Sequence, residues 1–273
     1  MDTRSLQYLK DSFAASDRMP LVFLGHGSPM NVIEDTPFGR AWTILGQNLP
    51  RPKAILVVSA HWVTRETTLV DVSAMPRTIH DFYGFPEALY TQQYPAHGDP
   101  GLAREVVTLL ASHRSQEDDT WGLDHGAWAV LKFLYPKADV PVFQVSIDMA
   151  RGLSHQLEIG RTLSELRDRG FLILGSGNVV HNLRTMRHDA KPLDFALEFD
   201  ALFSDRLADR DFAALTDEET LGTLLPQAHP TVDHYMPALT IAGASDARDE
   251  LTFMTDAIDL GSISMRSFVF NRA

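Results

Sequence analysis

The most regular feature of the chain is a series of short, continuous apolar runs separated by longer amphipathic stretches. Such runs, rich in Val, Ile and Leu, predict strands that are buried on both faces of a sheet. Five strands are expected, at residues 21–24, 54–59, 140–147, 171–174 and 263–270. The last run alternates more between apolar and polar residues, so we expect it at the outer edge of the sheet.

Between these runs, apolar residues recur at helical spacing. Helices are expected over residues 36–47, 100–112, 126–134, 154–169 and 192–208, with a shorter one over residues 233–242. Pro100 suits the first turn of its helix, and Ser154 suits a helix start. Strands that alternate with helices predict an α/β fold with a central, mostly parallel sheet and helices on both faces. We expect one domain over residues 1–273.

Residues 64–100 do not follow this alternation of strands and helices, because they are dense in aromatic residues and prolines and have no strong helical period. We expect a hairpin followed by an ordered excursion over one end of the sheet, since long loops in compact domains are often functional. Phe82, Tyr83 and Phe85 could close a site there. A loop that is only structural is an equal alternative.

Composition narrows the classes of partner. The chain has 36 acidic and 24 basic residues, a formal net charge of -12, so nucleic acids and anionic membranes are not expected partners. It has no cysteine, which excludes disulfides, thiolate nucleophiles and cysteine-based zinc sites. The first residues lack a signal-peptide pattern, and no apolar run approaches the ~20 residues of a membrane span, so we expect a cytoplasmic protein.

Three histidines follow predicted strands. His26 and His61 come directly after the first two strands, and His181 lies a few residues past the strand at 171–174. If these strands are parallel, all three imidazoles meet at the carboxyl edge of one sheet, where open α/β sheets bind ligands. Gly25 and Gly27 flank His26 and would allow a tight turn there. The histidines therefore predict a shared site.

Two further histidines lie at predicted helix starts. His125 precedes the helix at 126–134, and His234 opens the one at 233–242, where Asp233 could serve as the N-cap. Neutral imidazoles suit Zn, Fe, Cu or Ni. From these residues alone, an iron oxygenase and a zinc hydrolase are both sensible. We expect the other histidines outside the 229–234 stretch to be surface or loop residues, namely His80, His97, His113, His155 and His188.

The stretch Gly175-Ser176-Gly177 ahead of Asn178 could also cradle a phosphate. It lacks the third glycine of a dinucleotide-binding loop and the lysine of a P-loop. A turn that needs glycine is the favoured interpretation.

Several segments carry a family resemblance between about residues 20 and 245. In order they are FLGHGSPMN, VVSAHW, TIHDFYGFPEALYTQQYPAHG, DHGAW, GSGNVVHNL and DHYMPAL. Taken together they resemble the class III extradiol ring-cleavage dioxygenases, most closely the DOPA 4,5-dioxygenase branch. The resemblance implies an α/β fold with a central sheet, as the apolar pattern also predicts.

The resemblance also implies roles for the histidines. The first two metal ligands correspond to His26 and His61, and the third, a glutamate in the protocatechuate-cleaving branch, corresponds here to His234. His181 resembles the acid–base histidine, and without substrate it can also close on the metal as a fourth ligand. His125 resembles the histidine that contacts the substrate hydroxyl or bound oxygen.

The implied reaction is the opening of a catechol ring by O2 at one divalent metal ion per chain. Fe(II) is expected for activity, and Zn(II) is a second possible occupant because three histidines are also a familiar zinc set. Two alternatives stay open at this point: a zinc-dependent hydrolase, and a non-enzymatic metal-binding relative on the same fold. His181 and His125 count against the latter, since a binding module has little need of both.

Overall fold

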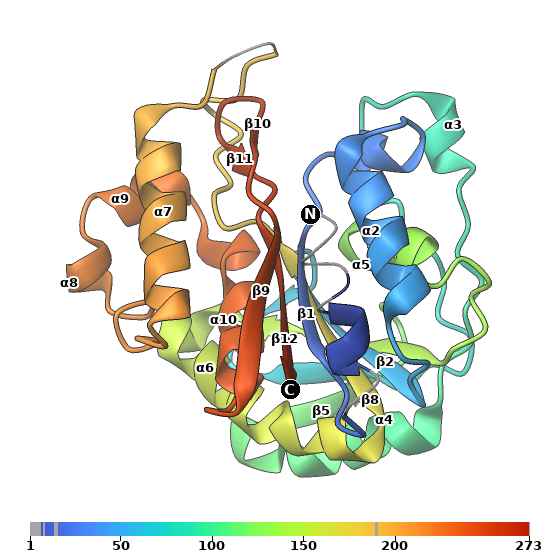
Figure 1. Ribbon diagram of the computed structural model, residues 1–273. Coiled ribbons are helices and arrows are strands. Elements are labelled where there is room, and N and C mark those ends of the chain that lie inside the picture. Colours follow the sequence, from blue (N-terminus) through green and yellow to red (C-terminus); the bar gives the residue numbers. More distant parts are fainter. Residues whose placement is uncertain (1–6, 8, 14–15, 189–190, 273) are drawn as a thin grey trace.

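The computed structural model describes residues 7, 9–13, 16–188 and 191–272, and a six-stranded sheet runs through its centre (Figure 1). The strands are β1 Leu21–Gly25, β2 Ala54–Ser59, β6 Val142–Gln144, β8 Phe171–Gly177, β9 Asp249–Thr255 and β12 Ser267–Arg272. Their order is β6-β2-β8-β1-β12-β9. The first four are parallel to one another, whereas β12 and β9 pair antiparallel. The predicted α/β fold with a mostly parallel sheet is therefore confirmed.

Two strand predictions need correction. The last predicted strand is not at the edge: β12 is almost wholly buried because β9 pairs along it, and β9 is the outer strand. The sequence did not indicate β9, since DELTFMT mixes polar and apolar residues and only two of the seven are buried. The run at 140–147 also divides, because its end forms β7 Ile147–Asp148, which pairs with β3 Val63–Thr64 outside the main sheet.

The six predicted helices are present close to their expected places, whereas the short helices at residues 87–90, 218–221 and 224–228 were not predicted. The helices are α2 Pro37–Asn48, α3 Glu87–Tyr90, α4 Pro100–Leu109, α5 His125–Leu134, α6 Gly152–Leu163, α7 Asp194–Ala208, α8 Glu218–Leu221, α9 Leu224–Ala228 and α10 Met236–Ala244. Short 3-10 helices lie at Pro29–Val32, Ala111–His113, Met149–Arg151, Ser164–Arg169 and Val232–His234. Among the described residues, no helix is long and apolar enough to cross a membrane.

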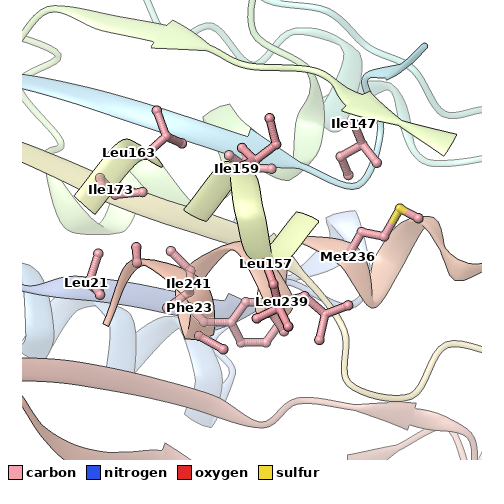
Figure 2. Packing of buried hydrophobic residues seen from close by; sticks show 14 of the residues in the cluster. Leu21, Phe23, Ile147, Leu157, Ile159, Leu163, Ile173, Met236, Leu239 and Ile241 are labelled. Atoms are coloured by element: carbon pink, nitrogen blue, oxygen red, sulfur yellow. The ribbon is translucent and has the colours of Figure 1, made fainter. Parts of the chain in front are cut away.

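Helices cover both faces of the sheet, as predicted. On one face Leu21, Phe23 and Ile173 pack against Leu157 of α6 and Ile241 of α10 (Figure 2). The intervening side chains of the same strands point to the opposite face and pack under α2 and α5. Figure 1 accordingly shows α2 and α5 on one side of the sheet and α6, α7 and α10 on the other. The continuous apolar runs reflect this burial from both sides.

The predicted hairpin after residue 64 is wrong. β4 Thr68–Asp71 pairs in parallel with β5 Ser115–Asp118, and β3 pairs with β7. The turn between β3 and β4 is stabilised by a residue distant in the sequence, because the backbone N–H of Glu66 donates to Asp148 at 2.8 Å. The excursion that follows lies against α5, where the indole N–H of Trp128 donates to the carbonyl of Ile79 at 2.8 Å.

A buried ion pair ties β9 to the 3-10 helix after α6. Arg167 contacts both oxygens of Asp249, at 2.6 and 2.8 Å, and neither side chain is exposed to solvent. We expect Asp249→Asn to lower the free energy of unfolding by about 3–5 kcal/mol, because it leaves the guanidinium buried without its counter-charge. The control is Asp139→Asn, which removes the exposed partner of Arg51 and should cost about 0–1 kcal/mol. Equal losses in urea unfolding would contradict this account.

Candidate metal centre

The carboxyl ends of β1, β2 and β8 meet at one edge of the sheet. Gly25 pairs with Gly177, and Ser59 pairs with Ser176, so the three strands end at nearly the same level. His26 continues this pairing, since its backbone N–H donates to the carbonyl of Gly177 at 3.0 Å. These three strands are therefore parallel, as the prediction of a shared histidine site requires.

Five histidines form one cluster beyond this edge. The ring centres of His26 and His61 are 5.1 Å apart, and the ring of His234 lies 5.3 and 4.9 Å from them. His181 stacks on His234 with ring centres 3.5 Å apart. The ring of His125, at the first turn of α5, is 3.9 Å from that of His61. The sequence therefore identified the histidines that gather here.

Three donor nitrogens are especially close. One ring nitrogen each of His26, His61 and His125 lies within 4.8 Å of the other two. The Nε2 atoms of His26 and His61 are 3.1 Å apart. This closest group includes His125, whereas the resemblance implies His234 as the third ligand.

The proton on His26 can be located from its neighbours. Its Nδ1 lies 3.0 Å from the hydroxyl oxygen of Ser176, which donates its own proton to the carbonyl of Gly126 at 2.5 Å. The serine oxygen must therefore accept a hydrogen bond from the Nδ1–H of His26. The Nε2 atom of His26 is left with a lone pair.

Carboxylates hold Nδ1 of three other rings. One oxygen of Asp81 lies 2.9 Å from Nδ1 of His125 and 3.3 Å from Nδ1 of His61, and Asp233 lies 2.9 Å from Nδ1 of His234. An ionised carboxylate can only accept hydrogen bonds, so Nδ1 of His125 and of His234 carries the proton, and the charge of Asp81 favours the same tautomer of His61. Sequence reasoning did not find Asp81, because it lies in an irregular segment with no periodic signal.

The donor set fits a divalent metal ion. The Nε2 atoms of His26 and His61 face each other at 3.1 Å, while Nδ1 of His26 contacts Ser176 and Nδ1 of His61 lies beside Asp81, so one cation could bind both Nε2 atoms. Histidine ligands of metal ions are usually neutral imidazoles whose other ring nitrogen donates a hydrogen bond to a carboxylate, a carbonyl or water. The cluster could therefore bind one ion of the Fe, Zn, Cu or Ni type.

Burial keeps these rings neutral. It lowers the pKa of His26 and His234 far below the usual histidine value, and the neighbouring histidines lower it further. Burial, followed by the nearby His125, lowers the pKa of His61 to about 3. For Asp81, burial raises the pKa, but hydrogen bonds and charge from His125 and His61 outweigh it and hold the pKa at about 2. The site therefore joins neutral nitrogen donors to an ionised carboxylate.

Gly27 and Gly177 each have a specific structural reason to be glycine. Gly27 has φ of +57°, which forms the tight turn expected after His26. A Cβ atom on Gly177 would lie 2.2 Å from the carbonyl oxygen of His234. That carbonyl accepts the backbone N–H of Asn178 at 2.9 Å. Glycine at the end of β8 thus allows the segment that carries His234 to approach the sheet edge.

The family model described as the catalytic LigB subunit of aromatic ring-opening dioxygenase matches residues 22–264. The chain belongs to this family. It is thus an extradiol dioxygenase, a metal-dependent enzyme that opens aromatic rings, and neither a hydrolase nor a non-enzymatic relative is favoured.

Similarity to known proteins extends over nearly the whole chain. The chain is 46% identical to a 4,5-DOPA dioxygenase extradiol of Escherichia coli K12, over 95% of this chain and 97% of that protein. It is 34% identical to a 4,5-DOPA dioxygenase extradiol of Beta vulgaris, over 91% and 95%. It also resembles the crystal structure of an uncharacterized Escherichia coli K12 protein, with a TM-score of 0.81, 40% identity and coverage of 92% and 99%.

In this dioxygenase the aromatic excursion contributes a wall beside the cluster. The ring of Phe82 meets His125 edge-on, with centres 5.5 Å apart, and Phe85 packs edge-on against Phe82 at 5.4 Å. Tyr83, by contrast, is 92% exposed. Of the three aromatic residues considered from the sequence, Phe82 thus lies directly against a site histidine.

Some of the surrounding predictions need correction. His155 is buried rather than on the surface, while His97 and His188 are exposed as expected. Asp233 is not an N-cap, because Thr231 occupies that position and the carboxylate of Asp233 faces His234 instead.

His229 is buried in a structural setting. Its Nε2 donates to the carbonyl of Val179 at 2.7 Å, and its ring packs against Phe199 and Tyr235. The backbone N–H of His181 donates to the carbonyl of Ala228 at 3.0 Å. The segment around His229 therefore supports the one that carries His181.

Proposed function

We propose that this dioxygenase opens the ring of a catecholic acid, DOPA or a close relative of it, at the histidine cluster. The observation that carries the site is the pair of facing Nε2 atoms of His26 and His61, 3.1 Å apart, where one cation could bind both nitrogens. The substrate class rests on the relatives from Escherichia coli and Beta vulgaris, which carry the name 4,5-DOPA dioxygenase extradiol.

We assign His26, His61 and His234 as the metal ligands. Three imidazoles that bind one ion at about 2.1 Å place their ring centres roughly 4.5–5.2 Å apart for angles between octahedral and tetrahedral. The ring separations within this trio, 5.1, 5.3 and 4.9 Å, agree with that spacing. His125 agrees less well, since its ring is 3.9 Å from His61 and 5.5 Å from His26.

We propose Fe(II) as the working metal and Zn(II) as an inactive occupant. Three neutral histidines accept either ion. Bound Fe(II) would supply a redox-active centre that holds the catechol oxygens and passes electron density toward O2, which redox-inert zinc does not do. The choice between the two metals therefore rests on the reaction class rather than on the ligands.

We assign His181 as the acid–base residue. Its ring has no hydrogen-bond partner within residues 16–188 and 191–272, whereas a hydroxyl or a carboxylate faces Nδ1 of the other four site histidines. Burial lowers the pKa of His181 to about 4, so the imidazole is neutral at pH 7 and can accept a proton from a catechol hydroxyl. It would return that proton as the ring opens. Its stacking on His234 also leaves it near enough to serve as a fourth ligand without substrate.

His125 is assigned to the substrate. Its Nδ1 proton is held by Asp81, so Nε2 is free to accept a hydrogen bond from a substrate hydroxyl. Phe82 provides an apolar surface beside it, which would help to exclude water from the reacting ring.

The test is turnover by protein reconstituted with Fe(II) without oxygen and then exposed to air. We expect L-DOPA to give a coloured, ring-opened product with two added oxygen atoms. NMR of this product should show that the bond between C4 and C5 of the ring was cleaved. A 1,3-dihydroxybenzene is the control, because its hydroxyls are not adjacent and cannot bind one metal together. Turnover only with zinc, on an ester or amide, would refute the proposal.

A further inference from the structure

Asp81 contacts two site histidines at once. Its Oδ2 lies 2.9 Å from Nδ1 of His125 and 3.3 Å from Nδ1 of His61. Its Oδ1 accepts the backbone N–H of His125 at 2.8 Å, which fixes the carboxylate at the start of α5. A single carboxylate thus connects the end of β2, the start of α5 and the aromatic excursion.

This geometry determines where both imidazoles carry their protons. The shared oxygen accepts a hydrogen bond from Nδ1 of His125. Its charge, 3.3 Å from Nδ1 of His61, favours the proton of that ring on Nδ1 as well, so the Nε2 lone pair of each ring points away from Asp81. A metal ligand and a substrate-contacting residue are thereby oriented by the same group.

We propose that Asp81 is a positioning residue that couples the metal centre to the substrate-contacting histidine, by holding the rings of His61 and His125 in one orientation and one tautomer. This inference rests on the proposed function for the role of His125. The arrangement of Asp81 itself does not depend on which metal or catechol is used.

Asp233 provides a matched comparison. It faces Nδ1 of His234 at 2.9 Å, and among the described residues its second oxygen is buried without a hydrogen-bond partner. Asp233 therefore supports one histidine, whereas Asp81 supports two. Asp81→Asn and Asp233→Asn are equal chemical changes that separate the two arrangements.

The first measurement is zinc affinity of the full-length protein by competition with a chromophoric chelator. We expect Asp81→Asn and Asp233→Asn each to weaken Zn(II) binding by about 10–100-fold, because each frees the orientation of one ligand. Asp81→Glu keeps the charge and should recover part of the loss, which separates this role from a folding defect. An Asp81→Asn affinity within twofold of the unaltered protein would overturn the proposal.

The second measurement reads the tautomers directly, by NMR of the ring nitrogens in the zinc-loaded, ¹⁵N-histidine-labelled protein. We expect Asp81→Asn to change the signals of both rings. An amide that turns its NH2 toward Nδ1 moves the proton of His125 to Nε2, whereas His61, whose Nε2 binds the zinc, keeps its tautomer and loses only the carboxylate beside Nδ1. Asp233→Asn should change His234 instead. An unchanged His125 tautomer in Asp81→Asn would overturn the coupling, whether or not the protein turns over a catechol.

The third measurement is kcat at saturating Fe(II) in a double-mutant cycle. We expect the loss caused by Asp81→Asn to shrink at least fivefold in the His125→Ala background, because the lost contact is then already absent. Losses that multiply independently would overturn the coupling. If the unaltered protein opens no catechol, the proposed function fails, while the zinc and NMR results still test Asp81.

Discussion

Replacing His181 with alanine should lower kcat for the catechol by about 10²–10⁴-fold, the usual contribution of a positioned acid–base group. The ring of His181 lies beside the proposed ligand His234 with ring centres 3.5 Å apart, and burial holds its pKa at about 4. Without it, the site loses the imidazole that we assign to accept the hydroxyl proton. Stopped-flow measurement of product formation at saturating Fe(II) gives the effect on chemistry.

His188→Ala is the control for this prediction, because His188 is an exposed histidine a short distance along the same segment. It should leave kcat within twofold of the unaltered protein. Metal content distinguishes the roles of His181: the alanine variant should still bind one ion per chain. A kcat above one tenth of normal in His181→Ala would contradict the acid–base assignment.

Replacing His26, His61 or His234 with alanine should abolish stoichiometric metal binding. Each replacement removes one of three nitrogen donors and leaves two, which is too few to hold an ion against a chelator at neutral pH. Metal analysis after dialysis against a weak chelator measures the effect. Activity should disappear in parallel, since the proposed reaction needs the ion.

His125→Ala is the comparison that decides the ligand set. We expect it to retain one ion per chain and to lower kcat to a slow but measurable value, because its ring is assigned to the substrate. Full metal content in His234→Ala together with loss of metal in His125→Ala would contradict the assignment. The ligands would then be the closest group, His26, His61 and His125.

The part of the site that sequence could predict is the part fixed by strand direction. His26 and His61 follow buried apolar runs, and parallel strands bring their ends to one edge whatever the details of packing. His125 and His234 could be associated with helix starts. Their roles, however, came from the family resemblance, because the spacing of residues along the chain does not show which ring nitrogens face one another.

The features that escaped prediction depend on contacts between distant segments. Asp81 lies in an irregular stretch, and only the fold brings it to His61 and His125. β9 was missed because an edge strand needs few buried residues, and its presence is what makes β12 internal. The hairpin after residue 64 failed for a similar reason, since Asp148, far along the chain, holds the turn.

The most direct test of the account is the fate of oxygen-18 gas in a single turnover of the Fe(II)-loaded protein with L-DOPA. The account predicts one O2 consumed per catechol and both labelled atoms in the ring-opened product. Product with no label, or a catechol that remains intact while oxygen is not consumed, would contradict the claim that this histidine cluster opens a catechol ring.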